Sequence, residues 1–156
     1  MRILGRLRTI ALLSNLLLIL AAADLKGAEN NPQAVRIKID TILASNQNDD
    51  FDSRLKPIEK QLKKSLKYRS YRLLKEESQN VPPQGNGTFD IPGGRTLIAS
   101  PQDVNSKQVA LKVRFQGGEK PLLDTILKLE NKTNFIFAGP RHENGILVLV
   151  IWATVQ

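Results

Sequence analysis

Histidine is the side chain best suited to moving protons at neutral pH, and this chain has one, His142. It stands in the turn-rich stretch Gly139–Gly145, between two apolar segments. A general base needs a positioned partner, and Glu143 does not become one merely by following in the sequence. A small hydrolase built on His142 would therefore have to recruit distant carboxylates, such as Asp90, Asp103 or Asp124.

The acidic loop Asn46–Asp52 has the oxygen-bearing side chains of a metal site. They recur at alternate positions, as at the start of a calcium loop. An EF-hand requires Gly at its sixth position and Glu at its twelfth, and counted from Asn46 these positions hold Phe51 and Pro57. The EF-hand is excluded, and a solvated loop before a helix N-terminus explains the acids better than a looser calcium site.

Other kinds of site find no support. The chain has no cysteine, which excludes disulfides, Cys-ligated metals and a thiol nucleophile. The glycines at 85, 87, 93 and 94 lack the spacing of a Walker or Rossmann loop and are typical of hairpin turns. We therefore predict no cofactor, no metal site and no catalytic residue.

The most unusual local feature is a concentration of positive charge. The chain carries 23 Lys and Arg against 15 Asp and Glu, a net charge of +8. Between residues 52 and 75, nine basic side chains are opposed only by Asp52 and Glu59, which leaves +7 in that segment. The nine are Arg54, Lys56, Lys60, Lys63, Lys64, Lys67, Arg69, Arg72 and Lys75. We predict that the first eight bind a polyanion.

A cationic amphipathic segment suits several partners. They are an anionic envelope polymer, a lipid surface or an acidic protein. Nucleic acid is disfavoured, because alternation places Tyr71 with Leu73 on a core face and leaves little to stack on bases. The simpler alternative is a solvated face whose lysines only keep the protein soluble.

The basic segment coincides with a predicted helix at about 53–67. Apolar residues recur there at spacings of three and four, with Asp52 or Ser53 as the cap and Pro57 in the first turn. The stripe consists of Leu55, Ile58, Leu62 and Leu66.

Around this helix the pattern predicts strands. The first alternates over 35–40, and a break at 81–87 separates a strand–helix–strand part, 35–79, from an all-strand part, 85–156. The seven apolar residues of 146–152 indicate a central strand covered on both faces. The remaining strands are predicted at 69–77, 88–91, 95–99, 107–115, 121–129 and 135–137. The fold class is α+β: a β-rich, sandwich-like domain of about eight short strands with one amphipathic helix.

The N-terminus is typical of a secretory signal peptide at 1–23. Three arginines precede an apolar run, Ile10–Ala23, that ends in three alanines. At 14 residues the run is shorter than the roughly 20 that span a membrane, although an uncleaved anchor is the alternative. We expect a mobile leader at 24–34 and a single domain at 35–156, exported to the periplasm or the cell exterior.

Several segments resemble a family of small, predicted exported bacterial proteins with no assigned activity. The similar segments are ILASN (42–46), RLKPIEKQL (54–62), YRSYRLLKEES (68–78), IPGGRTL (91–97), PLLDTILKLEN (121–131) and GPRHENGILVL (139–149). The resemblance implies export and a single domain, and it transfers no functional residue. We therefore expect an exported binding or structural protein, with a small envelope hydrolase as the alternative.

Overall fold

The computed structural model describes residues 33–156. The predicted signal peptide, 1–23, and most of the leader lie outside the described residues. Within them, no helix has the length and apolar character needed to cross a membrane. The strands are β1 (Val35–Ser45), β2 (Ser70–Val81), β3 (Gly87–Ile91), β4 (Arg95–Val104), β5 (Gln108–Gln116), β6 (Pro121–Glu130), β7 (Thr133–His142) and β8 (Gly145–Val155). A 3₁₀ segment, η1 (Ser53–Ile58), leads into the helix α1 (Glu59–Ser65).

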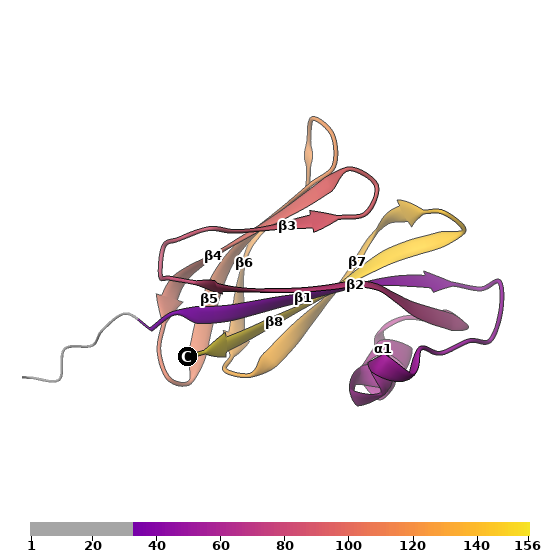
Figure 1. Cartoon of the computed structure of the whole chain (residues 1–156), viewed down its shortest axis with the longest axis horizontal. Helices are drawn as coiled ribbons and strands as arrows, with labels where there is room; N and C mark the ends of the chain where they lie inside the picture. The colour runs from indigo at the N-terminus through magenta and orange to yellow at the C-terminus, as the bar shows by residue number, and fades with distance from the viewer. Residues whose placement is uncertain (1–32) are drawn as a thin grey trace, which may run out of the picture. The chain divides into compact units, whose positions relative to one another are not determined.

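The strands form two four-stranded antiparallel sheets (Figure 1). Sheet A has the order β2-β1-β8-β7 and sheet B the order β3-β4-β5-β6. Buried residues from both sheets form one hydrophobic cluster, which includes Ile37 of β1, Phe89 of β3, Phe115 of β5 and Leu149 of β8. The prediction of a β-rich domain in packed sheets with one helix is confirmed.

Side-chain alternation explains which residues enter this core. In β5, Val109, Leu111, Val113 and Phe115 are all fully buried, while Lys112 and Arg114 between them are exposed. Period-two alternation is what a strand with one buried and one solvated face requires. The strand predicted at 107–115 is confirmed.

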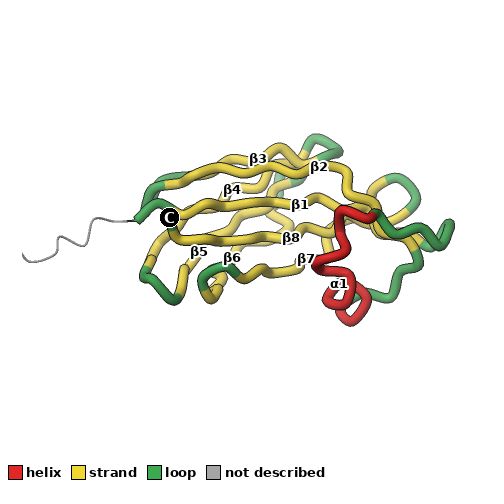
Figure 2. The backbone as a smooth tube through the Cα atoms, turned by 60° about the horizontal axis from the view of Figure 1, so that its bottom comes forward, coloured by secondary structure: helices red, strands yellow, loops and turns green. Residues whose placement is uncertain are grey.

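Strand β8 is buried on both of its faces. Leu147 and Leu149 belong to the cluster between the sheets, whereas Val148 and Val150 belong to a second cluster with the helical segment. The second cluster packs the outer face of sheet A against η1 and α1. Figure 2 shows α1 beside this sheet. The prediction of a central strand covered on both faces at 146–152 is therefore confirmed, and Val148 within it is fully buried.

The helical segment differs from the single helix predicted at 53–67. It consists of a 3₁₀ turn to Ile58 and an α-helix that ends at Ser65, because Pro57 has no N–H to donate and Leu66 is already extended. Asp52 caps the start, and its Oδ1 accepts a hydrogen bond from the Arg54 N–H at 3.0 Å. Leu62 is fully buried, as predicted.

Strand β2 runs past the predicted end at 77 and contains a bulge. Thr41 pairs with Lys75 and Ile42 with Leu73, so Leu74 is the extra residue. Because the extra residue shifts the alternation, Tyr71 and Leu73 face the helix while the later odd-numbered residues face sheet B.

The predicted turn at Gly139–Gly145 is mostly strand. Strand β7 continues to His142, which pairs with Gly145, and the tight turn is limited to Glu143 and Asn144. The Gly-Pro pair instead marks an irregularity in the pairing with β8. A Cβ on Gly139 would lie 3.0 Å from the Leu147 carbonyl oxygen, so the close approach of two backbones explains the glycine.

Candidate functional site

The eight basic residues predicted to bind a polyanion are all exposed, and seven lie in or next to the helical segment. We call the eight together the basic surface. Arg72 differs from the others, because alternation in β2 places it on the face opposite Tyr71 and Leu73, away from α1. There Arg72 meets Glu143 of the β7–β8 turn at 3.5 Å. The structure thus separates one predicted residue from the remaining seven.

Acidic side chains engage most of these cations. Glu59 pairs with Lys56 at 2.9 Å and with Lys63 at 2.6 Å. Asp52 binds the Arg54 guanidinium through two oxygens, at 2.9 and 2.6 Å. Arg69 forms a two-point ion pair with Asp49. Asp49 lies three positions before the segment 52–75, and Glu143 lies far beyond it. The net charge of +7 counted for that segment therefore left out the acidic partners of Arg69 and Arg72.

The pKa values of these acids follow from the same contacts. Hydrogen bonds from Arg54 hold the pKa of Asp52 well below its usual range. Hydrogen bonds from Lys63 and Lys56 lower the pKa of Glu59, and one from Arg69 lowers that of Asp49. The three carboxylates therefore remain ionised at neutral pH and neutralise a large part of the local charge.

Three lysines of the basic surface have no ion-pair partner among residues 33–156: Lys60, Lys64 and Lys67. Lys60 and Lys64 are four residues apart in α1 and therefore share one helix face, with Lys67 just beyond its end. Leu62 anchors the same short helix in the second hydrophobic cluster. The available positive charge is thus carried by three exposed lysines within residues 60–67, in and just after a helix that is anchored by a buried leucine.

Aromatic side chains beneath the basic surface are structural. The Phe51 ring lies 5.1 Å from the Lys63 Nζ and 5.8 Å, between centroids, from the Tyr71 ring. Tyr71 is 1% exposed, and its hydroxyl donates to the Leu66 carbonyl at 2.9 Å. Its predicted place on a core face is confirmed, and a ring so buried is not accessible to a base.

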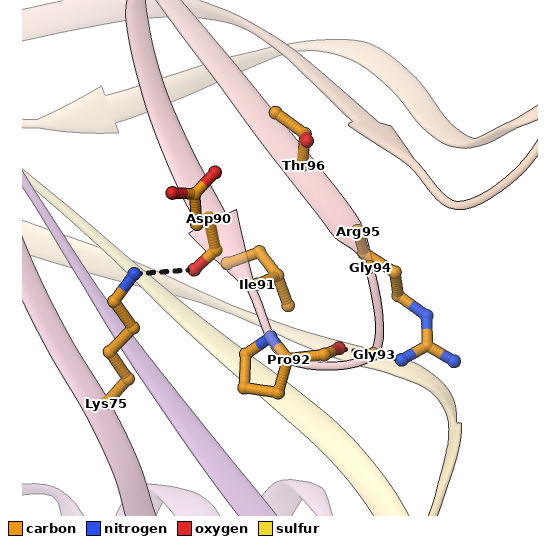
Figure 3. A pocket seen from close by; sticks show the side chains of 8 residues that line it. All are labelled: Lys75, Asp90, Ile91, Pro92, Gly93, Gly94, Arg95 and Thr96. Carbon is orange, nitrogen blue, oxygen red and sulfur yellow. Dashed lines mark hydrogen bonds between the residues drawn. The ribbon is translucent and has the colours of Figure 1, made fainter.

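An open pocket of about 570 Å³ lies at the β3–β4 turn (Figure 3). Its cations are already engaged by backbone oxygens: Lys75 donates to the Asp90 carbonyl at 2.9 Å, and Arg95 to the Pro92 carbonyl at 2.8 Å and the Arg141 carbonyl at 3.2 Å. These contacts close the turn against neighbouring strands. The pocket is therefore lined mostly by turn backbone and by cations that already have partners.

His142 lies beside this turn, since its Nδ1 would be 3.4 Å from a Cβ built on Gly93. Its Nε2 is 3.7 Å from the Glu143 carboxylate. Asp124 is ion-paired with Arg114 at 2.9 Å. Asp90 pairs with Thr96 of β4, and Asp103 lies seven residues further along that strand, roughly 23 Å from Thr96. The three distant carboxylates considered for a hydrolase are therefore spread over sheet B.

Two further arrangements bear on chemistry. Ser53 and Lys56 have the S-x-x-K spacing of some serine nucleophiles, but Lys56 is exposed and paired with Glu59. Within residues 33–156, no group of three or more His, Cys, Asp or Glu side chains is placed to hold a metal ion. Among the described residues, the arrangement best suited to a ligand is therefore the unpaired part of the basic surface.

One buried acid was not found from the sequence. Alternation along the first strand put Asp40 on its polar face, yet its side chain is only 5% exposed. Its Oδ2 accepts from the Trp152 Nε1–H at 2.8 Å, and Lys38 Nζ lies 3.2 Å from Oδ1. Burial raises the pKa of Asp40 despite these partners. The sequence did contain one indication of a buried acceptor, the single tryptophan within an apolar strand. A half-buried indole usually donates its N–H to a nearby acceptor.

No protein-family model matches the chain, and neither a curated protein nor a solved structure shows significant similarity to it.

Proposed function

We propose that this chain is an exported binding or structural protein of the cell envelope or exterior, and that it contacts a polyanionic surface through α1. The observation that carries the proposal is the group Lys60, Lys64 and Lys67, whose charges have no ion-pair partner among residues 33–156. The rest of the basic surface is largely neutralised by its own ion pairs, so these three lysines supply the attraction.

The chemistry favours an extended anion over a small one. An exposed ammonium group near an anionic surface gains about 1 kcal/mol, so three contribute about 3 kcal/mol. That alone corresponds to a dissociation constant weaker than about 1 mM. A polymer or membrane surface, which offers many charges to many copies, compensates for weak single contacts through multivalency. The substrate class is therefore an acidic polysaccharide or an anionic lipid surface.

The experiment compares two triple variants with the same change in net charge. The first replaces Lys60, Lys64 and Lys67 with Gln. The matched control replaces three exposed lysines in turns between strands, Lys107, Lys120 and Lys132, with Gln. Cosedimentation with vesicles rich in anionic lipid, and with an acidic polysaccharide, measures binding at low and at physiological salt.

We expect the first variant to lose most binding and the control to retain it. Binding of the native protein should weaken as salt rises, because the Debye length falls to about 8 Å near physiological ionic strength. Equal losses in the two variants would show that only net charge matters. A native protein that ignores both probes at low salt would show that the lysines serve solubility alone.

Export is tested separately. N-terminal sequencing of the mature protein should give Asp24 as the first residue, after cleavage that follows Ala23. A chain that retains Met1 and stays in the membrane fraction would contradict cleavage and leave the polyanion experiment unaffected.

A further inference from the structure

Among residues 33–156, no strand pairs with the outer edge of β6, which is therefore an open edge of sheet B. It pairs with β5 on one side and is the last strand of its sheet. The opposite edge, β3, is tied to sheet A by side chains, since Lys75 donates to the Asp90 carbonyl and Gln79 to the Thr88 carbonyl. Edge strands that are left open are templates for pairing with another chain.

The outer face of β6 also carries exposed apolar surface. Ile126 is 59% exposed and Leu122 is 43% exposed, and among residues 33–156 these are the large hydrophobic side chains that remain in solvent. Ile126 lies on the outer face of β6 with the exposed Asp124 and Lys128, whereas Leu122 is the extra residue of a bulge between Pro121 and Leu123. An apolar side chain in the middle of an unpaired strand is unusual, because natural edges are usually protected by charge.

We propose that a second copy of this chain pairs with β6, antiparallel, about a two-fold axis through Ile126. The two B sheets would then join into one continuous sheet of eight strands. The occupant is a second copy rather than a different protein because the strand is complementary to itself in charge. This inference is independent of the proposed polyanion binding.

The complementarity depends on the register. With the axis at Ile126, Asp124 of each copy stands opposite Lys128 of the other, so two ion pairs flank a central Ile–Ile contact. An axis at Thr125 puts Asp124 opposite Ile126, and an axis at Leu127 puts Ile126 opposite Lys128. An axis at Asp124 or Lys128 places that charged side chain opposite its own copy. Among these five registers, only the one at Ile126 sets two oppositely charged residues of β6 opposite each other.

Existing contacts leave the two charged groups available. Lys128 is exposed and has no ion-pair partner among the described residues. Asp124 receives both bonds from Arg114 on the same oxygen, Oδ2, at 3.1 and 2.9 Å. Its Oδ1 can therefore accept from a lysine across the axis while the pair with Arg114 is kept. On the inner face the same register sets Leu123 opposite Leu129.

The first experiment uses charge reversal and sedimentation equilibrium on protein purified from cells that express the full chain. We expect the native protein to dimerise. Asp124→Lys and Lys128→Asp should each weaken dimerisation by about tenfold or more, because two attractive pairs become repulsive. Mixing the two variants in equal amounts should restore a dimer, since in the mixed pair every position 124 again meets an opposite charge at position 128.

The second experiment uses the absence of cysteine in the chain. Ile126→Cys would place two thiols directly opposite each other, at the Cα separation of about 4.5 to 5.5 Å that a disulfide accepts. Mild oxidation should give a covalent dimer. Thr88→Cys, exposed on the opposite edge of sheet B, is the matched control and should remain monomeric.

Two results would overturn the inference. One is a native protein that stays monomeric up to about 1 mM, beyond which association is too weak to be specific. The other is a dimer that both single charge reversals leave intact and that Ile126→Cys does not trap. Circular dichroism confirms folding of each variant, and the cysteine experiment decides the matter if a charge reversal prevents folding.

Discussion

At the scale of single residues, Asp52 links three parts of the fold. Its carboxylate caps η1, binds the Arg54 guanidinium and accepts from the Leu73 N–H of β2 at 3.2 Å. The hydrogen bonds that lower its pKa stabilise the charged form in the folded state. A side chain that joins a helix start to a strand in this way contributes more than an ordinary surface acid.

We expect Asp52→Ala to lower the free energy of unfolding by about 1–2 kcal/mol at neutral pH through loss of the cap. Because the folded pKa is depressed, this contribution is present above the ordinary pKa of about 3.9 and is lost as pH falls through the folded value. Urea unfolding at several pH values measures it. The control is the neighbouring exposed Asp50→Ala, and equal effects of both variants would contradict the role of Asp52.

Asp40 should behave in the opposite way. Its folded pKa is raised, so its contribution to stability is greatest below about pH 4 and is lost as pH rises through the folded pKa. Asp40→Asn keeps an acceptor for Trp152 and removes the buried charge. The stability of this variant relative to native protein should therefore increase between about pH 4 and pH 7. Thr88→Asn, a substitution at an exposed position that removes no titratable group, is the control and should show no such trend.

At the scale of elements, a helical segment of 13 residues, Ser53–Ser65, is held by packing rather than by its length. Isolated helices so short are marginal in water, so α1 depends on the cluster formed by Leu55, Ile58 and Leu62 with sheet A. The same packing holds the proposed polyanion contact in place.

We expect Leu62→Ala to lower the free energy of unfolding by about 2–5 kcal/mol, because the side chain is fully buried and its truncation leaves a cavity. Ser65→Ala, exposed in the same helix, is the control and should change stability little. Thermal or urea unfolding compares them. A melting curve unchanged by Leu62→Ala would contradict the assignment of the helix to the core.

At the scale of the whole described unit, β8 joins the two hydrophobic clusters. Its alternate residues belong to different clusters, so neither layer can separate without exposing the strand. A domain of this size with shared core strands is expected to unfold as one unit.

We therefore expect a single cooperative transition. Trp152 is the only tryptophan of the chain and lies on β8, so its fluorescence reports on that strand alone. Far-UV circular dichroism reports on all of the strands. The two urea titrations should have the same midpoint, and distinct midpoints would show that the layers unfold separately.

The sequence by itself determined much of this protein. The strand number, the buried faces of β5 and β8, the helix stripe and the Asp52 cap follow from periodicity and capping, which are properties of neighbouring residues. The concentration of basic residues could be read in the same way. The bulges could not be predicted from the sequence. A residue such as Leu74 is extra only relative to the strand that pairs with it, so the pairing must be known first.

The tertiary structure decided which charges remain available and which edges remain open. Asp49 pairs with Arg69 and Glu143 pairs with Arg72, and these contacts join residues that are 20 and 71 positions apart in sequence. The burial of Asp40 depends on where Trp152 and Lys38 lie around it. The exposure of Ile126 depends on the outer face of sheet B being uncovered within residues 33–156, where Lys112 of the neighbouring strand is exposed as well. Patterns of neighbouring residues in the sequence specify the helices and strands. The order in which the strands pair specifies which side chains become neighbours in space, and these neighbours set the charge state and the exposure of each side chain.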